Sequence, residues 1–172
     1  MQGDPEIIEL LNEILTAELT AINQYFIHSR MCANWGLTEL AEHSYEESID
    51  EMKDADSIIE RILFLDGVPN MQRLNPVRVG ETVPEQLELD RQLEVAAVER
   101  YNRGIALAVT KDDNGTRELL AKNLVGDDRE APAAATSGAA VDGDLREGAR
   151  PGAHRGPDAL VVHGLAMADD HR

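Results

Sequence analysis

Three glutamates occupy positions that a helical repeat would normally fill with an apolar side chain. They are Glu18, Glu51 and Glu94, and each shares a three-and-four spacing with apolar neighbours that places it on the same helix face. An ionised carboxylate on a buried face is strongly unfavourable unless a cation or a metal ion accompanies it. One such carboxylate on each of three helices predicts a shared site for divalent metal ions.

A fourth carboxylate belongs to the same region of the sequence. Asp54 lies one helical turn after Glu51, so both side chains could reach one ion, and residues 46–56 (EESIDEMKDAD) hold six acids in eleven residues. No lysine or arginine occupies a matching position on the buried faces, which favours metal as the partner of the acids. The simpler alternative, in which each acid lies at a helix edge and faces water, stays open at this stage.

Two long helices are predicted in the first part of the chain. Asp4, Pro5 and Glu6 form a helix start, and apolar residues recur with a helical period until about Asn34. Thr38 is expected to cap a second helix, which carries Glu51 and ends at Gly67 and Pro69. Residues 67–82 contain glycine, proline and asparagine without a periodic pattern, and this predicts a long connection.

The remaining helices are shorter or interrupted. Thr82 and Glu85 form a capping box for a third helix that carries Glu94. Residues 111–115 are expected to form a turn, and Thr116 is expected to start a fourth helix that reaches about Val125. We therefore predict an all-α domain over residues 1–125: a four-helix bundle with one long crossover and a shortened or broken fourth helix.

The composition changes from about residue 126. Glycine or proline recurs at short intervals after this point, and residues 133–138 (AAATSG) are of low complexity. Residues 126–172 are therefore predicted to be a mostly disordered tail. Alanine, glycine, arginine and proline dominate this segment, which suggests either a GC-rich gene read out of frame or a genuine appended segment.

The overall composition excludes several classes of partner. The chain has 172 residues and a formal net charge of -17, which argues against nucleic acid and anionic membranes as partners and favours cations. Cys32 is the single cysteine, so an intramolecular disulfide is excluded and a cytoplasmic location is expected. Neither a secretion leader nor an apolar run long enough to span a membrane is recognisable.

Several stretches together closely resemble the bacterioferritins, the haem-containing ferritins. The resemblance covers residues 1 to about 125, and its motifs are GDPEIIELLNEILTAELTAINQYFIHSRMCANWGL, ESIDEMK with AD two residues on, ERILFLDGVPNMQRL and RVGETVPEQLELD. It implies a ferritin-like four-helix bundle that forms two-fold dimers and a hollow cage of twenty-four subunits. It also implies a ferroxidase that oxidises ferrous iron with oxygen or peroxide and stores the ferric product.

The resemblance also assigns roles to individual residues. Glu18, Glu51 and Glu94 match three glutamates that bind the two iron ions within one subunit, and Tyr25 matches a tyrosine close to them. Met52 matches the methionine that ligates the iron of haem b between two subunits. The resemblance thus implies iron and haem b as cofactors.

Two departures from the family pattern concern the iron ligands. Asp54 stands where the family has histidine, so that the expected EMKHAD is here EMKDAD. An ungapped comparison places Asp127 and Glu130 where the fourth helix should supply a glutamate and a second histidine. Both histidines are therefore missing, and the complete set would bind through oxygen alone, which predicts weaker iron binding and slower oxidation.

Two alternatives follow from these departures. The chain could be a non-catalytic haem-binding subunit that co-assembles with a competent ferritin subunit. It could instead be a truncated helical protein that cannot assemble, because the loss of most of a helix exposes the apolar faces of the other three.

Overall fold

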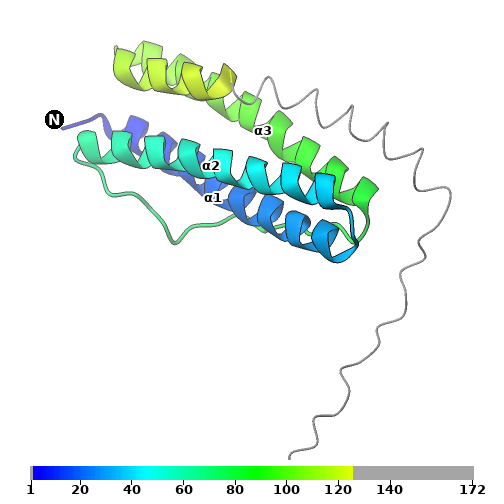
Figure 1. The fold of residues 1–172 in the computed structure, drawn as a ribbon. Helices are drawn as coiled ribbons and strands as arrows, with labels where there is room; N and C mark the ends of the chain where they lie inside the picture. The colour runs from blue at the N-terminus through cyan, green and yellow to red at the C-terminus, as the bar shows by residue number, and fades with distance from the viewer. Residues whose placement is uncertain (1, 126–172) are drawn as a thin grey trace, which may run out of the picture.

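The computed structural model describes residues 2–125 as an arrangement of helices joined by one long connection (Figure 1). The helices are α1 (Pro5–Asn34), α2 (Thr38–Phe64) and α3 (Val83–Thr110), and residues 114–125 form a fourth helical stretch. The described residues contain no strand, which confirms the all-α prediction. The expected break of the fourth helix and the expected disordered tail fall on residues 126–172, outside the described residues.

Helix α1 is the centre of the fold and contacts both α2 and α3. It starts where the sequence predicts, because the Asp4 side chain accepts a hydrogen bond from the backbone N–H of Glu6 over 2.8 Å. It ends at Asn34, and Gly36 takes a positive φ of 82° in the short link to α2. The hydrophobic core lies mainly between α1 and α2 and is completed by side chains of α3 and of residues 114–125.

The ends of α2 differ from the prediction. Thr38 is the first residue of α2 rather than its cap, and Leu37 occupies the cap position without a side-chain hydrogen bond. At the other end Asp66, not Gly67, takes the left-handed conformation with a φ of 58°. Aspartate tolerates this conformation better than most residues, and the backbone N–H of Gly67 closes the end by donating to Ile62 O over 2.9 Å.

The predicted start of α3 is confirmed, and the predicted start of the fourth helical stretch is wrong. Thr82 caps α3 as predicted and accepts from the backbone N–H of Glu85 over 3.4 Å. The prediction that Thr116 starts the fourth helix is wrong, because the helical stretch begins at residue 114. Asp113 is the cap, since its Oδ1 accepts from the backbone N–H of Thr116 over 3.0 Å. Aspartate is at least as strong a cap as threonine.

Hydrogen bonds and an ion pair join the fourth helical stretch and the turn before it to α2. The Arg61 Nη2 atom lies 2.5 Å from Asp113 Oδ1, and Arg61 Nε donates to Thr116 Oγ1 over 2.9 Å. Further along, Asn123 Nδ2 donates to Ser57 Oγ over 3.2 Å. These contacts place residues 114–125 beside α2 and complete the four-helix arrangement of the described chain.

The crossover between α2 and α3 is held on α1 by a regular set of side chains. Asn12, Thr20, Gln24 and His28, which we call the α1 polar row, follow a four-residue spacing with one step omitted, so they share one face of α1. Each accepts a hydrogen bond from a crossover N–H, at Asn70, Asn75, Arg78 and Gly80 respectively, over 2.7, 2.9, 3.2 and 3.0 Å. Four backbone donors of the irregular crossover are therefore satisfied by α1.

Candidate metal centre

The three glutamates that the sequence places on buried helix faces are all buried in the structure. Glu18 is 3%, Glu51 is 9% and Glu94 is 3% exposed, and they come from α1, α2 and α3 respectively. The alternative in which these acids lie at helix edges and face water is therefore wrong. Their role as iron ligands stays a prediction.

Glu18 and Glu51 line one cavity of about 270 Å³. Its wall is made by the three helices and by the crossover: Ala17, Glu18, Thr20 and Ala21 come from α1, Glu51 from α2, Leu93, Ala97 and Arg100 from α3, and Asn75, Pro76 and Arg78 from the crossover. From the sequence, no arginine is expected at a matching buried position. In the structure Arg100 nevertheless forms part of this wall, on the same face of α3 as Leu93 and Ala97.

Two buried tyrosines hold two of the glutamates. The hydroxyl of Tyr25 donates a short hydrogen bond to Glu94 Oε1, and the hydroxyl of Tyr101 donates to Glu18 Oε1 over 3.0 Å. Burial raises the pKa of Tyr25 well above its ordinary value, and the charges on Glu94 and Glu51 raise it further. Tyr25 therefore stays protonated and keeps its role as a donor.

Tyr101 is a site residue that the sequence analysis missed. Its spacing of seven residues from Glu94 was the available signal, because two helical turns return a side chain to nearly the same face. The partner, Glu18, lies on a different helix, and sequence spacing gives no information about such a pair.

Asp54 lies close to the same group of carboxylates. It is partly buried, and burial raises the pKa of its carboxyl to about 6, with the charge on Glu18 as the next largest cause. Lys122, from the fourth helical stretch, acts in the opposite direction. The charges of Asp54 and Glu18 therefore interact in the folded protein.

The carboxylates do not form a preassembled cluster in residues 2–125. No three His, Cys, Asp or Glu side chains of this range lie together as ligands for one ion. Asp127 and Glu130, which the sequence comparison offers as further ligands, lie outside the described residues. The described part of the site is thus a cavity with Glu18 and Glu51 in its wall, Asp54 interacting with the charge of Glu18, and Glu94 held by a hydrogen bond from Tyr25.

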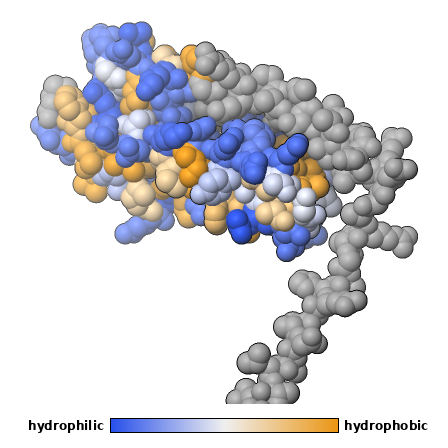
Figure 2. All heavy atoms as spheres, in the orientation of Figure 1, coloured by the Kyte–Doolittle hydropathy of each residue, from blue (hydrophilic) through white to orange (hydrophobic). Residues whose placement is uncertain are grey.

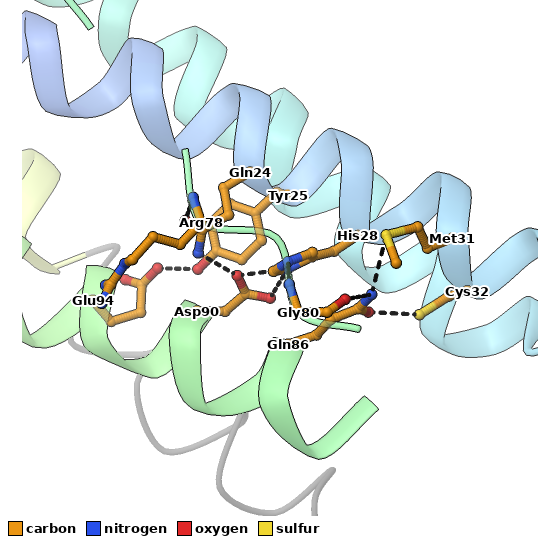
Figure 3. Close-up of polar contacts among 10 residues, drawn as sticks. All are labelled: Gln24, Tyr25, His28, Met31, Cys32, Arg78, Gly80, Gln86, Asp90 and Glu94. Carbon is orange, nitrogen blue, oxygen red and sulfur yellow. Dashed lines mark hydrogen bonds and ion pairs between the residues drawn. The ribbon is translucent and has the colours of Figure 1, made fainter. Parts of the chain in front are cut away.

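A second polar group lies next to this site and was not predicted (Figure 3). His28 and Gln24 of α1 both contact Asp90 of α3, at distances of 2.9 Å. Beyond them, Gln86 Nε2 donates to Gly80 O over 3.1 Å, and Gln86 Oε1 accepts from Cys32 Sγ over 3.2 Å. The sequence shows polar residues at helical spacing here, but it does not show that they face each other.

Cys32 is expected to be an unreactive thiol in the folded protein. It is fully buried, and burial raises its pKa to about 11. Only the thiolate reacts, and raising the pKa from 9.0 to about 11 lowers the thiolate fraction at pH 8 about 100-fold. Alkylation by iodoacetamide at pH 8, followed by mass spectrometry, should be at least this much slower in buffer than in urea; equal rates would contradict the packed thiol.

Met52 lies outside the cavity, on the outer side of α2. Its side chain is 51% exposed, and the large apolar residues Tyr45 and Leu63 of the same helix are also exposed. The face of the molecule seen in Figure 2 is mostly polar and carries separate apolar patches. An exposed thioether on a helix surface can be reached by a ligand or by another chain, which fits the family role of Met52.

The helical bundle with buried glutamates defines the chain as a ferritin-like protein. The family model described as Ferritin-like domain matches residues 8–133. The Mycobacterium tuberculosis bacterioferritin BfrA has a solved structure similar to this chain, with a TM-score of 0.81 and 46% identity, covering 86% of this chain and 92% of that one. The chain belongs to the bacterioferritin family.

Curated relatives agree with this assignment. The bacterioferritin of Mycolicibacterium paratuberculosis is 52% identical over 130 residues, which are 76% of this chain and 81% of the relative. The bacterioferritin of Streptomyces coelicolor is 54% identical over 113 residues, 66% of this chain and 68% of the relative. Among the described residues, no helix is both long and apolar enough to cross a membrane.

Proposed function

We propose that this chain stores and detoxifies iron in the cytoplasm by oxidising Fe(II) at the carboxylate cavity and retaining the Fe(III) product. The observation that carries the proposal is that Glu18 and Glu51, from separate helices, line one cavity. The charge of Asp54 interacts with that of Glu18, and the charges of Glu51 and Glu94 both act on Tyr25. Membership of the bacterioferritin family supports the same function. Carboxylate oxygens are suitable ligands for Fe(II), which is the substrate.

The residues of the cavity have separate tasks in this proposal. Glu18, Glu51, Asp54 and Glu94 bind Fe(II), and Asp127 and Glu130 are proposed to complete the set. Each Fe(II) gives up one electron to oxygen or peroxide. Tyr25 and Tyr101 donate hydrogen bonds to Glu94 and Glu18, which fixes the direction of the remaining carboxylate lone pairs. The retained and buried glutamates favour an oxidising subunit over a non-catalytic partner subunit.

The proposal is tested by mixing the purified chain with Fe(II) in air and following the absorbance of the ferric product by stopped flow. We expect oxidation faster than in buffer alone and retention of the iron by the protein on a desalting column. Oxidation at the buffer rate would contradict an oxidising subunit. Gel filtration of the same sample shows whether the chain reaches the size of a dimer or of the proposed twenty-four-subunit cage, alone or with another ferritin subunit.

We also propose that Met52 ligates haem b between two copies of the chain. The exposed thioether fits this role, because a methionine sulfur is a known axial ligand of haem iron. Haem so bound supplies one-electron transfer.

The haem proposal predicts that Met52→Ala abolishes the Soret band of the purified protein. The substitution removes the ligand atom, and because Met52 is 51% exposed the fold should be retained. Met71→Ala, at an exposed methionine of the crossover, is the matched control and should keep the band. A Soret band of unchanged position and intensity in Met52→Ala would refute the assignment.

A further inference from the structure

Two chains of hydrogen bonds run from the crossover through α1 and end on one carboxylate of α3 (Figure 3). In the first, the backbone N–H of Arg78 donates to Gln24 Oε1 over 3.2 Å, and Gln24 Nε2 donates to Asp90 Oδ1 over 2.9 Å. In the second, the backbone N–H of Gly80 donates to His28 Nε2 over 3.0 Å, and His28 Nδ1 lies 2.9 Å from both oxygens of Asp90.

The direction of both chains is fixed at the crossover, because a backbone N–H can only donate. Gln24 must therefore turn its oxygen towards Arg78 and its amide group towards Asp90. His28 must accept at Nε2 and carry its ring proton on Nδ1, from which it donates to Asp90. Asp90 thus receives one donor from each chain. A carboxylate presents an acceptor at both oxygen positions, whereas an asparagine in either orientation places its NH2 group about 2.9 Å from at least one of these donors.

Water cannot replace these bonds easily. Gln24 and His28 are fully buried and Asp90 is only 6% exposed. If two N–H groups faced each other at this buried position, one would lack an acceptor, and the folded state would be destabilised by the full desolvation free energy of that group. The crossover also lies very close to α3 here, since a Cβ added to Gly80 would lie 2.5 Å from the backbone nitrogen of Gln86.

The segment that the two chains hold is part of the cavity wall. Arg78, together with Asn75 and Pro76, forms the crossover side of the cavity that contains Glu18 and Glu51. We propose that Asp90 is a positioning residue: by accepting from both chains it holds the crossover at Arg78 and Gly80 and so sets the shape of the carboxylate cavity. This inference rests on the proposed function in one respect only, namely that the cavity binds a metal ion.

The first test is amide hydrogen exchange of the full chain carrying Asp90→Asn. The amide at the crossover end of the mismatched chain, Arg78 for Gln24 or Gly80 for His28, should exchange at least about ten-fold faster than in the wild type. The amide of Asn70 lies earlier in the crossover and donates its hydrogen bond to Asn12 Oδ1. It should keep its exchange rate and is the internal control. The affinity for Co²⁺, followed by its visible absorption, should fall about ten-fold.

The second test adds Gln24→Glu to Asp90→Asn. The introduced carboxylate can accept from the Arg78 N–H and from the introduced amide, whose oxygen can accept from His28, so the matching of donors and acceptors returns with the same net charge. Exchange rates and Co²⁺ affinity should return towards the wild type, which a role in packing alone would not produce. Unchanged exchange or unchanged Co²⁺ affinity in Asp90→Asn, or no recovery in the double variant, overturns the proposal. A wild-type chain that binds Co²⁺ but does not oxidise Fe(II) contradicts the proposed function alone.

Discussion

Replacement of Glu51 by glutamine is expected to slow Fe(II) oxidation by about 100-fold or more. The substitution keeps the shape of the side chain but removes a negative charge and an anionic ligand from the wall of the cavity. Loss of an outer-shell partner of a metal ligand already costs about 10- to 100-fold in affinity or activity, so loss of the ligand itself should lie at or beyond the upper end. Stopped-flow absorbance of the ferric product gives the rate.

The matched control for this variant is Glu46→Gln. Glu46 lies on the same helix and is exposed, so the change in net charge is identical while the cavity is untouched. A general effect of charge on the attraction of Fe(II) would slow both variants equally. The assignment of Glu51 as a ligand requires that Glu51→Gln alone is slow, and similar rates for the two variants would remove it.

Replacement of Asp54 by histidine is expected to raise both the affinity for Fe(II) and the oxidation rate, by about ten-fold. The carboxyl of Asp54 is partly buried and close to Glu18, so its negative charge adds to an already anionic group. A neutral imidazole binds iron well without that repulsion, and its ring is longer than the aspartate side chain. Titration with Fe(II) without oxygen gives the affinity, and stopped flow in air gives the rate.

Asp56→His is the appropriate comparison, because Asp56 is exposed on the same helix and gives the same change of residue type. It should leave affinity and rate unchanged. If Asp54→His oxidises Fe(II) no faster than the wild type, then the aspartate does not limit the site, and the predicted weakness of an all-oxygen ligand set is wrong.

The features that repeat along a helix could be predicted from the sequence. The buried positions of Glu18, Glu51 and Glu94 follow from spacing alone, because apolar neighbours three and four residues away mark the face that a helix buries. The boundaries of α1 and the cap of α3 were also predicted, since Asp4, Pro5 and Thr82 act on backbone groups within a few residues.

The features that were predicted wrongly or missed are of two kinds: a helix start for which several residues could act as the cap, and contacts between residues far apart in the sequence. Thr116 was expected to start the fourth helix, but Asp113, three residues earlier, caps it by accepting from the backbone N–H of Thr116. Local sequence does not show which of several good capping residues is used. The contacts of His28 with Asp90 and of Tyr101 with Glu18 join residues separated by 62 and 83 positions. Such pairs depend on how helices pack side by side, which periodicity within one helix does not determine.

The α1 polar row has a consequence for the order in which the nascent chain acquires its structure. The α1–α2 hairpin can form as soon as both helices have left the ribosome, because its contacts are close in sequence. The crossover cannot settle completely at that time, since the donor chains that begin at Arg78 and Gly80 end on Asp90 of the next helix. The crossover therefore reaches its final position only after α3 has been synthesised, and the last wall of the cavity forms at the same time.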